Sequence, residues 1–346
     1  MNLLMNFLLS RSTVGAIACF TVCGYAEAAP AYRIEALYST LDGTYQYVQL
    51  RDLRAPGQEN PEYLALTSTN RYGVVKTRQV ANLPNRPGQG GVLLATVRMA
   101  GFWDAANMGD YYPPELGAVL PERFVPTDGG TIELTDGDRW VHDSLPVDGV
   151  NALTRDSGIV GASALDALGH SFGPRSAVWV NVVEYHNATY GRYFLTASAP
   201  DIDALDSGRI AGWKRTGESL LTFDRGPGVV VSVCRYYYPT GDIGSHFFSA
   251  SAEECASVGA QVQGAQLETA AAFYVALPDK VTGACPGNVT VGIVTYVKTE
   301  PIYRVWDAVG GFEHRYTHAR ALRDQWVAEG WKAEGYGPDA VAMCGT

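Results

Sequence analysis

The sequence has no basic segment and little charge. Its 346 residues carry 26 Lys and Arg against 36 Asp and Glu, and the charged fraction is 18%. No run of Lys or Arg occurs. Nucleic acids and anionic membrane surfaces attract concentrated positive charge. We therefore expect neither as a partner.

Long apolar stretches are also missing after residue 28, so we expect no membrane insertion of the mature chain. The first 28 residues differ. Arg11 is the only charge before Glu27, an apolar run covers 12–23, and Ala26-Glu27-Ala28 has the form of a cleavage site. This pattern predicts a cleaved signal peptide at 1–28 and a secreted or periplasmic protein. An uncleaved anchor, or a lipoprotein attached through Cys19, is a weaker interpretation.

Cysteines are few, and no C-x-x-C pair exists, which argues against zinc. We expect no metal and no cofactor. Two of the six cysteines lie in the predicted signal peptide. An even number remains in an exported chain, which predicts two disulfides. The remaining four allow three pairings: Cys234, Cys255, Cys285 and Cys344.

Residues 32–153 lack a long helical period and contain short strand patterns. Residues 45–50 alternate with a change of phase between Tyr47 and Val48, which suggests a bulge. Residues 91–97 are continuously apolar, and 131–141 form a hairpin pattern around Asp136-Gly137. We predict a β-sandwich. Its pattern QYVQL, GVLLAT, GGTIELTDG, DSLP resembles a lamin-tail-like immunoglobulin sandwich. The Gly-rich stretch 154–176 follows as a predicted linker, with a short helix over 162–168.

The C-terminal part, 178–346, repeats one short phrase. It reads YFLT at 193–196, HFFS at 246–249 and HRYT at 314–317. A strand and a turn precede each copy, and a helix pattern follows two residues later. The first two helices begin with the capping boxes 198–201 and 251–254, whose acid should reach back to the first residue of the box. Gly-Trp-Lys follows the first and third helices; the second unit lacks this Trp.

These patterns predict three units of hairpin, short capped helix and returning strand, which pack together because one unit cannot bury its apolar face. The chain as a whole is then α+β and mostly β. Within this arrangement the pairing Cys234–Cys255 and Cys285–Cys344 is favoured.

The phrases H-[FY]-[FY]-T and G-W-x-x-E-G resemble a family of exported bacterial domains of unknown function. The resemblance covers about half of the chain. It implies a bacterial, exported module that is sometimes attached to secreted hydrolases, and it brings no catalytic residues. The first unit departs from the pattern, because Tyr193 stands where His is usual.

Catalytic patterns are few. Gly169-His-Ser171-Phe-Gly173 matches the nucleophile elbow G-x-S-x-G, but the elbow needs a strand before Ser171 and a helix after it, and the pattern here is reversed. His314 and His318 have metal-like spacing without a third ligand. We find no carboxylate pair placed for acid–base catalysis.

Aromatic, His and Arg side chains recur at matching positions and are the candidate binding residues: Trp213, Trp331, Tyr236, Trp306, Tyr316, His246, His314, Arg235 and Arg304. Repeated aromatics are more often core than ligand platform, and repeated Arg more often form internal ion pairs. The leading hypothesis is a non-enzymatic binding or adhesion protein that recognises polysaccharide or envelope glycan. The alternatives are a serine-type hydrolase and a scaffold that docks exported proteins.

Overall fold

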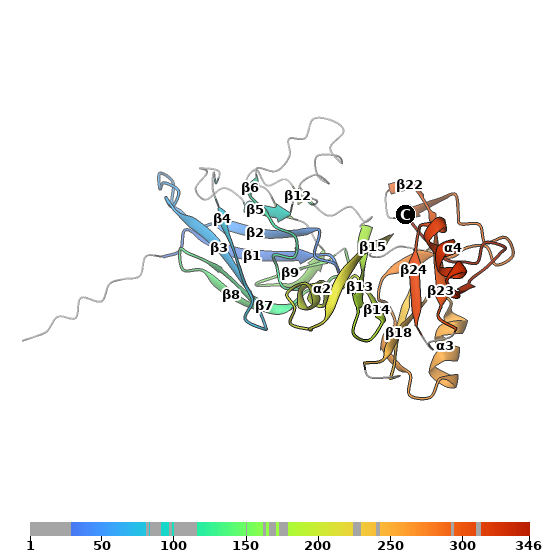
Figure 1. Ribbon diagram of the computed structural model, residues 1–346. Helices are drawn as coiled ribbons and strands as arrows, with labels where there is room; N and C mark the ends of the chain where they lie inside the picture. The colour runs from blue at the N-terminus through green and yellow to red at the C-terminus, as the bar shows by residue number, and fades with distance from the viewer. Residues whose placement is uncertain are drawn as a thin grey trace, which may run out of the picture.

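The structure is a computed structural model of the chain. It describes residues 29–80, 83, 91–96, 99, 116–149, 151–161, 164–165, 171–172, 179–223, 230–239, 243–291, 294–308 and 313–346. The predicted signal peptide, 1–28, lies outside these residues. The chain is mostly strand with a few short helices, as predicted (Figure 1). Among the described residues, no helix is long and apolar enough to cross a membrane.

The N-terminal part is a β-sandwich of two sheets. One sheet has the order β10-β9-β1-β2-β5-β6 and the other the order β4-β3-β7-β8. Side chains such as Leu37, Leu50 and Leu66 point inward from both sheets and form one buried cluster. The strands are β1 Tyr32–Ser39, β2 Gln46–Asp52, β3 Leu64–Asn70, β4 Val75–Val80, β5 Gly91–Thr96, β6 Leu116–Leu120, β7 Asp128–Leu134, β8 Arg139–Ser144, β9 Asn151–Thr154 and β10 Gly158–Gly161.

The bulge predicted at Tyr47 and Val48 is wrong. Both residues pair in regular register with β1, and the irregularity lies on β1 between Ile34 and Ala36. The change of phase has another cause. Val48 packs in the inner core, whereas Tyr47 belongs to a second buried cluster on the outer face of the same sheet. A strand buried on both faces shows no clean alternation.

The strands of the sandwich continue past residue 153 into the predicted linker. β9 and β10 form a hairpin, in which Ile159 pairs with Leu153, and this hairpin extends the six-stranded sheet. Two short strands follow, β11 Ala164–Leu165 and β12 Ser171–Phe172, which pair with each other. The predicted helix over 162–168 is therefore wrong at Ala164 and Leu165. Its other residues lie outside the described part of the chain.

The C-terminal module consists of three units with one topology, as predicted. In each unit the first strand pairs with the second on one side and with the returning strand on the other. Unit one contains β13 Trp179–Asn187, β14 Arg192–Thr196, α2 Ala199–Asp206 and β15 Trp213–Phe223. Unit two contains β16 Val230–Ser232, β17 Cys234–Tyr238, β18 Ser245–Ser249, α3 Ala252–Gln261, β19 Gln266–Thr269 and β20 Tyr274–Ala276. Unit three contains β23 Glu300–Trp306, β24 His314–Thr317, α4 Arg320–Ala328, β25 Lys332–Glu334 and β26 Val341–Gly345.

The units are joined through their strands. Units one and three share a nine-stranded sheet with β16 and β20, while β18, β17 and β19 form a sheet of their own. A separate hairpin, β21 Asn288–Val291 and β22 Val294–Lys298, precedes unit three. Core side chains from all three units meet in one cluster that includes Leu195, Phe248 and Tyr316.

The helix caps differ in detail from the prediction. Ser198 and Ser251 cap α2 and α3, and Ala319 gives α4 no side-chain cap, as expected. However, the acid of each box does not reach back to the cap. Glu254 instead accepts from the Ser249 hydroxyl, which in turn accepts from the Ser251 amide. The strand hydroxyl therefore links the helix start to the hairpin, because it can donate and accept at once.

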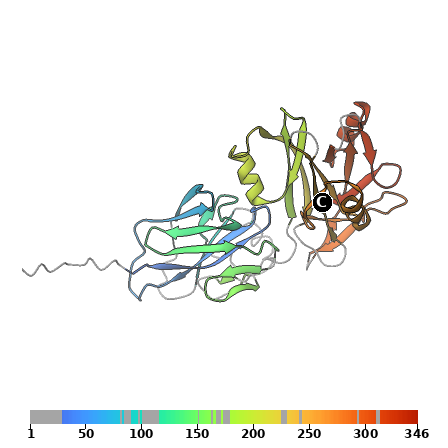
Figure 2. The ribbon, with the colours of Figure 1, turned by 90° about the horizontal axis from the view of Figure 1, so that it is seen from below.

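The sandwich and the module contact each other at the start of α2 (Figure 2). The Leu41 carbonyl, in the turn after β1, accepts from the Ala199 amide at 2.9 Å. The buried Asp42 carboxylate accepts from the Asn181 amide of β13 at 3.0 Å. Lys76 and Arg123 of the sandwich both contact Asp203 of α2. The sandwich thus helps to hold the first unit in place.

Both predicted disulfides are present, Cys234–Cys255 and Cys285–Cys344. Cys234–Cys255 joins β17 to α3. Helix α3 has no fully buried residue, whereas α2 buries Ile202 and Leu205. The bridge therefore adds a covalent attachment to the partial apolar packing of α3, whose Val258 contacts the cluster around Tyr236.

Replacement of Cys234 and Cys255 by Ala should lower the free energy of unfolding by about 2–4 kcal/mol, because the bridge limits the unfolded chain. The measurement is urea unfolding followed by circular dichroism. Reductant should then destabilise the wild-type protein more than the double variant, which keeps only Cys285–Cys344. Equal midpoints for wild type and variant would contradict this assignment.

Candidate functional site

Arg235 and Arg304, two predicted binding residues, form ion pairs that join neighbouring units. Arg304 contacts Glu334 of its own unit at 2.9 Å and makes two hydrogen bonds to Glu254 at the start of the preceding unit's helix. Arg235 repeats this arrangement with Glu268 and Asp201. Burial acts to raise the pKa of Glu254, but the hydrogen bonds and charge of Arg304 outweigh it and lower that pKa.

An ion pair also joins unit one to unit three, and here the first strand carries the carboxylate instead of the guanidinium. The first strand of unit one carries Glu184 at the position of the two arginines, by register with the second strand. Glu184 is fully buried and accepts two hydrogen bonds from Arg315 of unit three. The guanidinium of Arg315 also lies between the rings of Tyr193 and Trp326, 3.9 and 4.0 Å from their centres. This pair joins the last unit to the first.

His246 and His314 are equally internal. Each lies 3.4 Å from the glutamate that its unit's Arg also contacts, Glu268 and Glu334 respectively. Each also meets a ring of the preceding unit edge-on, Phe194 for His246 and Phe247 for His314. Tyr193 occupies the matching position in unit one. The repeated His is thus part of the contact between successive units.

The predicted aromatics lie at separate places. Tyr316 is buried, and its hydroxyl exchanges hydrogen bonds with the backbone of Phe248. Tyr236 is buried and donates to the Cys255 carbonyl. Trp213 packs in a cluster with Tyr185 and Ile202. The remaining two are half-buried: Trp331 lies edge-on to Tyr193, and Trp306 lies beneath Lys332. The nine predicted binding residues therefore do not gather on one face.

Glu313 precedes the third copy of the repeated phrase, in a turn where the sequence favours an internal ion pair over a binding role. The positions before the three copies are Arg192, Ser245 and Glu313, and the fold brings them together. Arg192 donates to Glu313 at 3.3 Å, and the Tyr193 amide donates at 2.8 Å. Burial raises the pKa of Glu313 to about 7 despite these donors. Extending the alignment of the three phrases by one residue toward the N-terminus would have placed these three residues at one equivalent position.

Glu313 should make stability depend on pH. Its folded pKa of about 7 lies above its ordinary value of 4.5, so the folded state binds the proton more tightly. This contribution is complete below about pH 4.5 and is lost as the pH rises through 7. The measurement is urea unfolding at several pH values. The free energy of unfolding of the wild type, minus that of Glu313→Gln, should decrease as the pH rises from about 4.5 to about 7. A difference that stays constant with pH would contradict the shift.

The Arg315–Glu184 pair should be essential for the module. Arg315→Met leaves the Glu184 carboxylate buried without its partner, so we expect a loss of about 3–5 kcal/mol in the free energy of unfolding. The control is Arg320→Met on α4, whose pair with Asp339 is exposed and should be worth less than about 1 kcal/mol. Similar losses of unfolding free energy in the two variants would show that the Arg315–Glu184 pair contributes no more to stability than an exposed pair.

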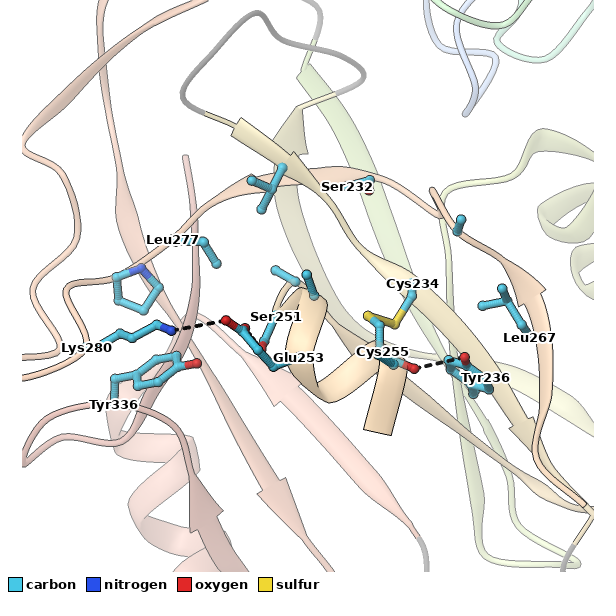
Figure 3. Close-up of a pocket in the computed structure, with 16 residues that line it drawn as sticks. Ser232, Cys234, Tyr236, Ser251, Glu253, Cys255, Leu267, Leu277, Lys280 and Tyr336 are labelled. Atoms are coloured by element: carbon cyan, nitrogen blue, oxygen red, sulfur yellow. Dashed lines mark hydrogen bonds and ion pairs between the residues drawn. A yellow bond between two sulfur atoms is a disulfide. The ribbon is translucent and has the colours of Figure 1, made fainter. Parts of the chain in front are cut away.

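A hollow in the module lies over the start of α3, beside the Cys234–Cys255 disulfide (Figure 3). Its volume is about 720 Å³. Figure 3 shows Tyr336, Lys280 and Glu253 at one end and Tyr236 with Leu267 at the other. Lys280 Nζ lies 3.6 Å from Glu253 Oε1, and the Ser251 hydroxyl donates to the other Glu253 oxygen at 2.9 Å.

Small side chains create this hollow. Its wall includes Ser232, Ala250, Ala252, Ala256 and Ala270, whose short side chains leave space between the larger ones. Two of these, Ala252 and Ala256, are four residues apart on α3 and so share one face of the helix. In the sequence, the run Ser249-Ala-Ser-Ala252 indicated the start of a capped helix and did not indicate a hollow.

The other sequence candidates stay apart from this hollow. Ser171 lies in strand β12, and the other residues of its motif, apart from Phe172, lie outside the described residues. His318 Nδ1 lies 2.9 Å from the Pro301 carbonyl. Within the described ranges, no group of three His, Cys, Asp or Glu side chains could hold a metal ion.

Residues 280–341 match a family described as a domain of unknown function, DUF5648. The match covers less than a fifth of the chain and contains β23, β24, α4 and β25 of unit three. Lys280 and Tyr336 of the hollow fall inside it, and α3 falls before it. No curated protein and no solved structure matches the chain.

Proposed function

We propose that this is an exported, non-enzymatic binding protein, and that the hollow over α3 binds a carbohydrate chain. The observation that carries the proposal is the hollow itself, which is open, mostly apolar in lining and bordered by a few polar groups at one end. Binding sites for small ligands usually combine an apolar wall with a few well-placed polar groups. Sugar rings have this same mixture of apolar faces and polar edges.

Polar groups at the Tyr336 end suit hydroxyl recognition. Glu253 accepts hydrogen bonds, Lys280 donates them, and Ser251 does both. Backbone and Ser251 hydrogen bonds, together with Lys280, lower the pKa of Glu253, so its carboxylate stays ionised. The Tyr336 ring borders the same end and offers a surface on which a sugar ring can stack.

The absence of a catalytic set in the hollow supports binding over hydrolysis. Among the described lining residues, the two cysteines form the disulfide, and the one carboxylate, Glu253, has a lowered pKa that is unsuited to a general acid. Two disulfides fit the secreted or periplasmic location that the N-terminal pattern predicts. A protein-docking role is the alternative that the binding experiment separates from this one.

Filling the hollow tests the proposal. Ala256→Trp places a large ring in the hollow, and we expect at least tenfold weaker retention on the insoluble polysaccharide that holds the wild type. Ala260→Trp is the matched control, since Ala260 is exposed on the same helix and lies outside the lining. Melting curves of both variants confirm that the fold persists.

The readout is a pull-down on cellulose, chitin, peptidoglycan and native cell envelopes. Glu253→Gln and Lys280→Met should also weaken retention, because each removes a polar group of the hollow. If Ala256→Trp binds as well as Ala260→Trp, the hollow is not the site. If the wild type retains only envelope proteins and no polysaccharide, the docking role replaces the proposal.

A further inference from the structure

A second hollow lies on the sandwich, on the outer face of the six-stranded sheet. Its volume is about 350 Å³, within the usual range for small-ligand sites. Side chains from three neighbouring strands line it. Glu35 comes from β1, Gln49 and Arg51 come from β2, and Thr154 comes from β9.

The bulge in β1 contributes to this hollow. Glu35 has no partner in the register between Ile34 and Ala36, so it is the extra residue of the strand. Bulges commonly redirect a side chain. Here the Glu35 carboxylate meets Arg51 of β2, whose Nε and terminal nitrogen donate to the same oxygen at 2.9 and 2.7 Å.

The charges around the hollow hold one another in place. Arg33 donates to both oxygens of Asp156, at 2.9 and 2.5 Å, and lies 3.2 Å from Glu35. Arg51 is half-exposed beside them. The hydrogen bond from Arg33 lowers the pKa of Asp156, so that carboxylate is ionised at neutral pH. Two guanidinium groups and two carboxylates thus cancel in charge while each keeps free capacity for hydrogen bonds.

A ligand for this hollow should be uncharged and rich in hydroxyl groups. Alternating donors and acceptors on a rigid sheet match hydroxyls, which donate and accept at once. A phosphate would meet the carboxylates of Glu35 and Asp156, and an amine would meet the guanidinium of Arg51. The hollow also has an apolar part, which is formed by the small side chains of Ala36 and Ala152.

We propose that this hollow is a second binding site, specific for a neutral mono- or oligosaccharide and separate from the hollow over α3. It does not depend on the function proposed for the module, because it belongs to the sandwich and shares no lining residue with the other hollow. A chain with two sites would hold a polysaccharide more firmly than either site alone through effective concentration.

Two pairs of variants test the second site. Ser157→Trp covers the hollow from the β9–β10 turn, and Ser144→Trp is its control at an exposed position on β8 of the other sheet. Arg51→Met removes a donor, and Arg139→Met is its control, since Arg139 is an exposed, ion-paired arginine on β8. The probe is an array of neutral and acidic oligosaccharides, followed by titration calorimetry with the best neutral binder.

We expect Ser157→Trp and Arg51→Met to weaken binding of a neutral oligosaccharide at least tenfold, while both controls and Ala256→Trp keep wild-type affinity for it. Three results would overturn the proposal: no neutral oligosaccharide binds, binding is confined to acidic sugars, or Ser157→Trp binds like Ser144→Trp. Loss of binding in Ala256→Trp alone would support the module site and reject the sandwich site.

Discussion

The C-terminal module depends on one repeated electrostatic contact, a carboxylate of one unit held by a guanidinium of the next. Asp201 meets Arg235, and Glu254 meets Arg304. Glu184 and Arg315 then return from the last unit to the first with the charges exchanged. Buried charges are costly unless paired with good geometry. Arg304, Arg315 and Glu184 are largely buried, so their pairing across units favours packing of the three copies into one body.

Because of these ion pairs between units, most of the repeated residues have a structural role. The histidines contact the same glutamates as the arginines, and the phrase that repeats most clearly is the one that packs unit against unit. The proposed binding surface belongs to the unit that differs most from the other two. Unit two has Ala265 where units one and three carry Trp, and a disulfide joins its helix to β17. The hollow over α3 lies beside that disulfide.

The sandwich and the module are linked rather than independent. The turn after β1 supplies both the Leu41 carbonyl at the start of α2 and the buried Asp42 carboxylate on β13. Two hollows on a chain joined in this way would keep a defined separation. Such an arrangement suits an extended polymer, because its repeating residues can occupy both sites at once.

Local patterns in the sequence determined much of this fold. The hairpin–helix–strand units and the Ser caps follow from turn chemistry and capping, which act over a few residues. The repeat of these units then favoured the two disulfide pairs over the other pairings. Tertiary structure decided the rest. The double burial of β2, the closure by Glu184 and Arg315, and the cluster around Glu313 join residues more than a hundred positions apart or on two faces of a sheet. No local propensity encodes such contacts, because each depends on which surfaces packing brings together.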